Sequence, residues 1–336
     1  ILSHEIAAQI LPGDDDEDVV ALYLPSTYRA ESEVARRLRE MIDAMPDTMA
    51  TDLSAQIDEL ERVEGIAFHT QQRQAIETAV TSGMTVITGG PGTGKTTIIK
   101  CIIKLLSVHG DIALAAPTGR AAKRMSEACG MEAKTLHRLL EYGGEEGDFA
   151  RTQDNPLEYD ALIIDEMSMV DIFLMRSLLR ALVPGTRLIM VGDADQLPSV
   201  GAGNVLRDIL DSGAIPSVRL TEIFRQDEKS MIVYNAHRIN RGEAPRLNAK
   251  GSDFFFERAV SPSDAAKRIV ALCASRLPSF LHLDPVRQMQ VLSPTKKGEC
   301  GVWMLNQLLQ AEFNPAAPGK HERVRGDTTF REGDKV

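Results

Sequence analysis

The feature that most constrains this chain is a glycine-rich segment, Gly-Gly-Pro-Gly-Thr-Gly-Lys-Thr, at 89–96. It lies between an apolar run at 84–88 and an amphipathic stretch at 95–108. The segment matches the pattern G-x-x-x-x-G-K-[ST], in which backbone N–H groups surround a phosphate at the N-terminus of a helix. Because the strand, loop and helix signals follow in this order, the segment predicts a phosphate-binding loop, with an ordinary glycine-rich turn as the alternative.

The side chains of this loop predict how a nucleotide would be held. Lys95 would supply a positive charge to the β- and γ-phosphates, and the Thr96 hydroxyl can bind Mg²⁺. Glycines let the backbone curl closely around a phosphate. We therefore expect a nucleoside triphosphate and Mg²⁺ as cofactors, and the residues expected to bind the nucleotide are Gly90, Gly92, Thr93, Gly94, Lys95, Thr96 and Thr97.

Short apolar runs alternate with amphipathic stretches from Thr70 onward. The expected strands are 84–88, 112–115, 161–164, 187–191 and 218–220, and the expected helices between them are 95–108, 119–129, 171–182 and 203–211. Strands that are apolar on both faces and separated by helices are typical of a parallel sheet covered on both sides. The fold class is therefore predicted to be α/β.

Two carboxylates follow the expected strand at 161–164. Asp165 is expected to hold the Mg²⁺ directly or through water, and Glu166 to polarise the attacking water. The alternative is a pair of acids favoured at a helix N-terminus by the helix dipole. At the end of an adjacent strand, Gln196 is placed to sense the γ-phosphate, although the segment 192–198 can also be a simple turn rich in Gly, Asp and Pro.

The charge distribution bears on nucleic-acid binding. The chain has 38 basic and 48 acidic residues, which by itself opposes a broad surface for polyanions. Residues 1–64 hold 16 acidic and 5 basic side chains, so the remaining residues are nearly neutral. Within them, the segment 116–138 has five basic side chains and two acidic ones. This local excess predicts a nucleic-acid surface, with a solvated helix face as the alternative.

Length and composition limit the classes of protein to which the chain can belong. The 336 residues suggest about two domains, and no apolar run reaches the ~18 residues of a membrane span, so no membrane partner is expected. The four cysteines have no zinc-site spacing, which favours reduced thiols in a cytoplasmic protein. The chain starts without Met and stops in a polar stretch, and we expect it to be a fragment of a longer protein.

The expected domains follow from changes in pattern along the chain. Helical stripes at 31–45 and 53–63 predict the end of an N-terminal helical domain at 1–64, followed by an ATPase domain at 65–225. Residues 226–336 begin a second unit that looks incomplete. Its expected helices lie near 229–241, 262–276 and 301–313, and its expected strands near 253–256 and 288–292.

The ordered set of motifs resembles superfamily 1 helicases, and within them the RecD-like branch. The matching segments are 72–76 (QRQAI), the loop at 89–96, 116–122 (APTGRAA), 135–140 (TLHRLL), 164–168 (IDEMS), 192–198 (GDADQLP), 220–226 (LTEIFRQ), 292–298 (LSPTKKG) and 305–310 (LNQLLQ). The resemblance covers roughly residues 20–336 and implies two RecA-like domains with ATP bound between them.

The resemblance also implies roles for single residues. Gln72 would recognise adenine, Gln196 would couple the γ-phosphate to DNA, and Arg225 would be an arginine finger. An Arg suits that role because its charge is permanent and its planar fork matches phosphate oxygens. From the residues alone, Gln72 can equally be an exposed helix residue and Arg225 part of a surface salt bridge.

By the same resemblance, DNA would be contacted from both units. Thr hydroxyls at loop ends and helix starts can grip phosphates without reading bases. A β-hairpin at 141–158 would be a wedge where the duplex splits, and a surface loop is the alternative. His137 could stack on a base or fill a polar gap. The expected DNA contacts are Thr118, Arg120, Thr135, His137, Arg138 and Ser293.

The resulting hypothesis is the motor core of an ATP-dependent DNA helicase in recombination or repair. The family implies 5′-to-3′ movement on single-stranded DNA, unwinding at duplex junctions, and other subunits of a helicase–nuclease complex as partners. A non-catalytic nucleotide switch and a superfamily 1 RNA helicase are the alternatives. The family's later motifs would lie beyond Val336, so we expect this chain to bind nucleotide but to hydrolyse it slowly and not to unwind DNA.

Overall fold

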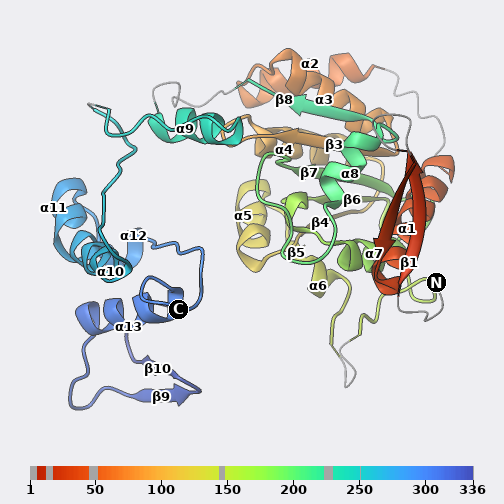
Figure 1. Cartoon of the computed structure of the whole chain (residues 1–336). Helices are drawn as coiled ribbons and strands as arrows, with labels where there is room; N and C mark the ends of the chain where they lie inside the picture. Colours follow the sequence, from red (N-terminus) through yellow and green to blue (C-terminus); the bar gives the residue numbers. More distant parts are fainter. Residues whose placement is uncertain are drawn as a thin grey trace. The chain divides into compact units, whose positions relative to one another are not determined.

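The computed structural model describes residues 6–12, 18–44, 52–143, 148–222, 230–249 and 251–335. The chain forms two compact units, Ile1–Pro245 and Arg246–Val336. Figure 1 shows the elements of each unit. We describe the units separately.

A six-stranded sheet forms the centre of the first unit. Its order is β5-β4-β6-β7-β3-β8, and every neighbouring pair is parallel. The strands are β3 (Met84–Gly89), β4 (Ile112–Ala116), β5 (Ala133–Thr135), β6 (Ala161–Ile164), β7 (Arg187–Gly192) and β8 (Ser217–Leu220). The α/β fold is therefore confirmed. The sequence missed β5, because three half-buried residues are too few to show a strand pattern.

Alternate residues of each strand point to opposite faces of the sheet and fill two separate cores. In β6, Leu162 and Ile164 belong to one core, whereas Ala161 and Ile163 belong to the other. This period of two explains why the strands are apolar throughout, since both faces are buried.

Helices cover both faces of the sheet. One core includes residues of α2 (Leu53–Glu64), α3 (Thr70–Thr81), α4 (Lys95–Leu106) and α5 (Gly119–Cys129). The other includes residues of α1 (Pro25–Ala44), α6 (Leu136–Leu139), α7 (Ile172–Ala181) and α8 (Val205–Ser212). A 3₁₀ turn (Met167–Met169) precedes α7, and α9 (Met231–Asn240) follows the sheet (Figure 1).

The N-terminal segment packs against this sheet. Helix α1 buries Ala30, Val34, Leu38 and Met41 in the core that it shares with α7. Glu33 of α1 accepts two hydrogen bonds of 2.6 Å from Arg180 of α7. An antiparallel hairpin, β1 (Ala7–Pro12) and β2 (Asp18–Tyr23), precedes α1 and was not expected. The domain boundary at residue 64 remains a prediction.

The described residues of the second unit, 246–249 and 251–335, form helices and one hairpin. The helical pattern at 262–276 is confirmed as α10 (Pro262–Ala271) and a π-helical turn (Leu272–Arg276). The other elements are α11 (Leu277–Leu281), α12 (Pro285–Gln288), α13 (Val302–Phe313), β9 (Glu322–Arg325) and β10 (Thr328–Arg331).

The strands expected near 253–256 and 288–292 are not formed, although all of these residues are described. In the first segment, the Asn248 side chain takes the place of a neighbouring strand. Its Oδ1 accepts from the Phe256 N–H (2.8 Å) and its Nδ2 donates to the Phe256 carbonyl (3.2 Å). An apolar run becomes a strand only if another strand supplies the backbone partners.

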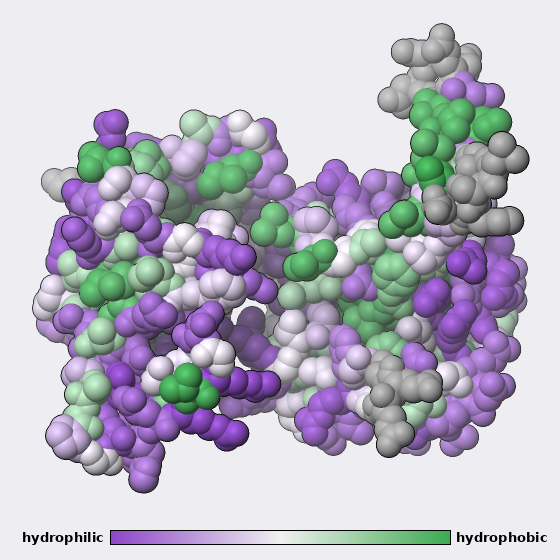
Figure 2. All heavy atoms as spheres, turned by 60° about the horizontal axis from the view of Figure 1, so that its bottom comes forward, coloured by the Kyte–Doolittle hydropathy of each residue, from purple (hydrophilic) through white to green (hydrophobic). Residues whose placement is uncertain are grey.

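The described helices include none that is both long and apolar enough to span a bilayer. On the face that Figure 2 shows, the exposed apolar residues lie in separate patches within a mostly polar surface.

Candidate nucleotide site and nucleic-acid interface

The expected nucleotide residues follow the carboxyl ends of neighbouring parallel strands, which all lie at one edge of the sheet. The phosphate-binding loop follows β3, and the Asp165–Glu166 pair follows β6. Between these two strands lies β7, which ends at Gly192 and leads into Asp193. The sheet order therefore brings residues about 70 positions apart in the sequence to the same edge.

The loop after β3 has the backbone shape that its glycines allow. Gly92 and Gly94 have φ angles of 81° and 84°, a region that residues with a Cβ avoid. A Cβ at Gly94 would also collide with the Gln72 side chain. The Thr93 hydroxyl donates to the Gly90 carbonyl (2.9 Å) and closes the loop.

Lys95 begins α4, and its side chain folds back over this loop. Its Nζ donates to the Gly90 carbonyl (2.9 Å) and to the Gly89 carbonyl. Burial lowers the pKa of Lys95, and the negative charges of Asp193, Asp165 and Glu166 oppose this change. The charges of all three carboxylates therefore act on the ammonium group.

Asp165 and Glu166 form the acidic part of the site. Asp165 Oδ1 accepts from the Glu166 N–H (2.8 Å), and Glu166 has the unusual φ of 57°. Burial raises the pKa of Asp165, and both burial and the Asp165 charge raise the pKa of Glu166. The positive charges of Lys95 and of Arg124 in α5 act in the opposite direction and lower the pKa of both carboxyl groups.

Asp193 is a site residue that the sequence analysis did not single out. It is only 4% exposed, and its Oδ2 accepts from Gln196 Nε2 (3.1 Å). The next residue is held by β3, because the Ala194 N–H donates to the Thr88 hydroxyl (3.1 Å). Its position directly after an apolar strand, beside the Asp-Glu strand, was the signal that could have identified it.

Gln72 is buried against the phosphate-binding loop, at 5% exposed. Its Nε2 donates to the Thr93 carbonyl (3.1 Å), and its Oε1 accepts from the His69 N–H (3.0 Å). The surface-residue interpretation of Gln72 is therefore wrong. Its neighbour Gln71 accepts from the N–H and the hydroxyl of Thr221, after β8, at 2.9 and 3.0 Å.

The residues present fit a nucleoside triphosphate with Mg²⁺. The loop forms a narrow cradle, since no Cβ would fit at Gly94 and one at Gly89 would lie 2.8 Å from the Leu220 Cβ. Asp165 and the exposed Thr96 of the first turn of α4 offer oxygen ligands of the kind that Mg²⁺ prefers, and Thr97 beside it is half-buried.

Four of the expected DNA contacts lie beyond β4 and β5 at the same edge. Thr118 caps α5 by accepting from the Ala121 N–H (3.2 Å), and Thr135 caps α6 by accepting from the Arg138 N–H (3.1 Å). Because Ala116 pairs with Thr135 in the sheet, these two loop ends are neighbours. Arg120 and Arg138 are exposed beside them.

The other expected contacts are placed differently. His137 is exposed in α6 but packs against two aromatic rings. Ser293 belongs to the second unit, where its hydroxyl donates to the Cys300 carbonyl (2.7 Å). Arg225 lies outside the described residues.

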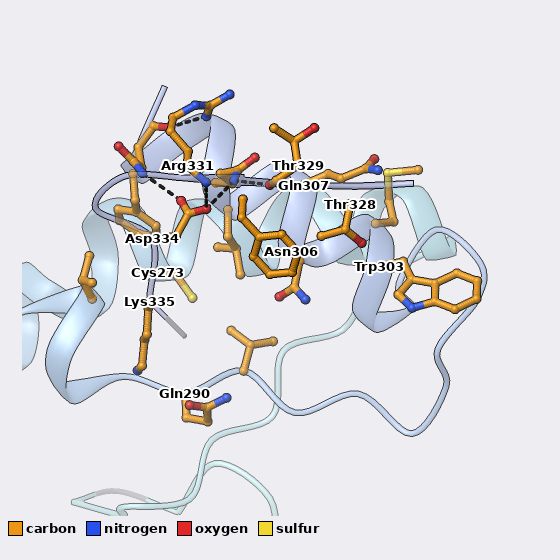
Figure 3. Close-up of a pocket in the computed structure, with 18 of the residues that line it drawn as sticks. Cys273, Gln290, Trp303, Asn306, Gln307, Thr328, Thr329, Arg331, Asp334 and Lys335 are labelled. Atoms are coloured by element: carbon orange, nitrogen blue, oxygen red, sulfur yellow. Dashed lines mark hydrogen bonds between the residues drawn. The ribbon is translucent and has the colours of Figure 1, made fainter. Parts of the chain in front are cut away.

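The second unit contains a pocket of about 1130 Å³ next to α13. Asp334, which Figure 3 labels, forms part of its wall. It accepts hydrogen bonds from Gln310 Nε2 (2.7 Å), Asn314 Nδ2 (2.7 Å) and the Arg331 N–H (2.6 Å). Trp303 and Lys297 also line it, with the Lys297 ammonium 5.9 Å from the centre of the Trp303 ring. None of the expected site residues lines this pocket.

Comparison with known proteins agrees with the motifs. A family described as "AAA domain" matches residues 72–202. The chain is 36% identical over 315 residues to an ATP-dependent RecD2 DNA helicase of Deinococcus radiodurans, covering 92% of this chain and 42% of that protein. It is 33% identical over 300 residues to the RecBCD enzyme subunit RecD of Mycolicibacterium smegmatis, covering 80% and 48%.

The chain thus spans about half the length of these curated relatives. A solved structure, the Pif1 helicase of Candida albicans, is similar with a TM-score of 0.43 and 26% identity, covering 54% of this chain and 45% of that one. From its motifs, its parallel sheet and its curated relatives, the chain belongs to the RecD-like branch of the superfamily 1 helicases.

Proposed function

We propose that this chain is the motor core of an ATP-dependent DNA helicase that moves along single-stranded DNA. The observation that carries the proposal is the sheet order, in which β7 lies between β6 and β3. The phosphate-binding loop with Lys95, the Asp165–Glu166 pair and Asp193 therefore follow neighbouring strand ends at one edge of the sheet. Thr118 and Thr135 belong to the same edge of the same sheet. One rigid sheet would thus link a nucleotide site to a DNA surface.

Each residue of the site would have a defined task. Lys95 would exchange its carbonyl partners, Gly89 and Gly90, for phosphate oxygens. Asp165 and Thr96 would hold Mg²⁺, which supplies charge neutralisation at the phosphates. Glu166 would take the proton of the attacking water, and its raised pKa suits a group that must accept a proton.

Other residues would connect the nucleotide to its surroundings. Gln72 would contact adenine from its place beside the loop, and Arg225 would approach the γ-phosphate as an arginine finger. Gln196 would sense whether the γ-phosphate is present through Asp193, to which it donates a hydrogen bond. The remaining loop residues, Gly90, Gly92, Thr93, Gly94 and Thr97, would bind phosphates through backbone and hydroxyl groups.

DNA would be held mainly by its phosphates. The capping hydroxyls of Thr118 and Thr135 and the exposed charges of Arg120 and Arg138 are suited to this. Such contacts give binding that tolerates any sequence and weakens with salt. Ser293 would contribute from the second unit. Movement in the 5′-to-3′ direction, unwinding at junctions and assembly with other helicase–nuclease subunits are part of the proposal, by analogy with the RecD relatives.

The test compares nucleotide-dependent binding of single-stranded DNA by the wild type and by Lys95→Ala. A fluorescent oligonucleotide is titrated with and without a non-hydrolysable ATP analogue. We expect the analogue to change the DNA affinity of the wild type but not of the variant. Lys100→Ala is the matched control, because Lys100 is exposed on the same helix.

The same titration separates the alternatives. If nucleotide binds but DNA affinity never depends on it, the switch interpretation is favoured and the motor proposal fails. Competition with an RNA oligonucleotide of the same sequence addresses the RNA helicase. An RNA affinity above the DNA affinity would contradict the proposal.

A further inference from the structure

Between α6 and β6, the described residues 140–143 and 148–157 form the two sides of a short hairpin, which we call the 140–157 hairpin. The two sides are joined by backbone hydrogen bonds, the first from the Gly143 N–H to the Asp148 carbonyl (3.3 Å). In the opposite direction, the Ala150 N–H donates to the Glu141 carbonyl (3.3 Å) and the Arg151 N–H to the Leu140 carbonyl (3.2 Å). Arg151 and Glu141 also form an ion pair at 2.8 Å.

Three aromatic rings meet at the base of this hairpin. The His137 ring centre lies 5.5 Å from that of Tyr142 and 5.7 Å from that of Phe149, and the latter two are 5.1 Å apart. Phe149 packs against the core of the sheet, whereas Tyr142 is 54% exposed. His137 thus joins α6 to both sides of the hairpin.

The backbone strengthens this connection. The Tyr142 N–H donates to the His137 carbonyl (2.8 Å), so the hairpin starts directly from the last turn of α6. The same short helix is capped by Thr135, an expected DNA contact. Helix α6 and the hairpin are therefore continuous. A single DNA strand bound at Thr135 and a DNA duplex at the hairpin would both contact this segment.

The returning side of the hairpin is tied to two further helices. Arg37 of α1, only 8% exposed, donates through its Nη2 to Gln153 Oε1. The Leu157 N–H donates to the Ala181 carbonyl at the end of α7 (2.7 Å). The hairpin is consequently supported by α1, α6 and α7 rather than by its own few backbone bonds alone.

We propose that His137 is a positioning residue that fixes the 140–157 hairpin relative to the DNA-binding edge, instead of a residue that stacks on a base. Two neighbouring rings already contact its imidazole, and the aromatic contact depends on a flat ring more than on its nitrogens. The functional part of this inference rests on the proposed function, together with the expectation from the family resemblance that a hairpin at 141–158 is a wedge where the duplex splits.

The test uses His137→Ala and His137→Phe in the 336-residue chain. Hydrogen–deuterium exchange is measured for the amides of Gly143, Ala150 and Arg151. We expect His137→Ala to speed their exchange by up to about tenfold, the effect of losing aromatic contacts, while His137→Phe restores slow exchange. His109→Ala is the control, since His109 is exposed and precedes β4 at the opposite edge of the sheet.

A second readout compares the affinities for a forked duplex and for single-stranded DNA. We expect His137→Ala to lose the preference for the fork, to keep its single-strand affinity within about twofold, and to be rescued by His137→Phe. Unchanged hairpin exchange together with weaker single-strand binding would overturn the inference in favour of base stacking. If no variant and no wild type binds DNA, the proposed function fails, and the exchange rates still decide whether His137 holds the hairpin.

Discussion

Two carboxylate residues at the nucleotide site are held in energetically unfavourable environments. Asp165 and Glu166 keep raised pKa values because burial removes water from their carboxylates. Glu166 also has a left-handed backbone, which costs of the order of 1 kcal/mol in a residue with a Cβ. Groups destabilised in this way without a ligand are typical of functional sites.

Asp165→Asn should therefore stabilise the nucleotide-free protein at pH 7. Because its folded pKa is raised, Asp165 binds its proton more tightly in the folded than in the unfolded state. Its ionisation thus removes stability as the pH rises through the folded value. Asn avoids this ionisation and can still accept from the Glu166 N–H. We expect a gain of the order of 1 kcal/mol at pH 7 that shrinks toward about pH 4, measured by thermal unfolding.

The control for this change is Asp211→Asn, since Asp211 is exposed on α8. It should change the stability by less than about 0.5 kcal/mol. A less stable Asp165→Asn at pH 7 would mean that the interactions of Asp165 with Lys95 and Arg124 outweigh its burial.

Among the helices and strands, α1 bears most directly on the expected domain boundary at residue 64. Its apolar stripe was read as part of a separate helical domain, yet the stripe faces the same core as β3, β4, β6 and β7. An amphipathic stripe indicates that a helix is half-buried, but it does not indicate which surface covers it.

Met41→Ala tests whether α1 belongs to the cooperative unit of the sheet. Met41 is 2% exposed in that core, so its truncation should cost about 2–5 kcal/mol in urea unfolding followed by a probe of the whole unit. Ile42→Ala, on the same helix but 36% exposed, should cost much less. An unchanged midpoint in Met41→Ala would instead favour an independent domain that ends near residue 64.

Across the full chain, the two compact units divide the expected functions unequally. The first carries the phosphate-binding loop, the three carboxylates, and Thr118 and Thr135. The second carries Ser293 and the pocket beside α13. A nucleotide should therefore affect the two units differently.

Calorimetry with and without an ATP analogue tests this division. At 100 times its dissociation constant, a ligand stabilises the folded state by about 2.7 kcal/mol. We expect this to raise the unfolding temperature of the first unit by roughly 5–11 °C and to leave that of the second unchanged. Lys95→Ala should lose the shift. Equal shifts of both transitions would show that nucleotide binding involves the second unit as well.

Much of the fold and part of the site could be predicted from local pattern. The loop at 89–96 and five of the six strands in the sheet were identified, because turn geometry and strand periodicity depend on residues close in sequence. Asp165 was found for the same reason, since it directly follows an apolar strand. Gln72 and Arg225 needed the family resemblance, because a single polar residue in a helix or loop has no local signature.

The remaining features depend on contacts between distant residues, which no local pattern records. The order of the sheet places β7 between β6 and β3 and so brings Asp193 to the edge that carries the phosphate-binding loop. The meeting of His137 with Phe149 depends on how a hairpin returns to its helix. The segments at 253–256 and 289–292 stay irregular, because a strand forms only where another strand supplies hydrogen-bond partners. Local sequence therefore defined the chemical groups, and long-range packing determined which of them meet.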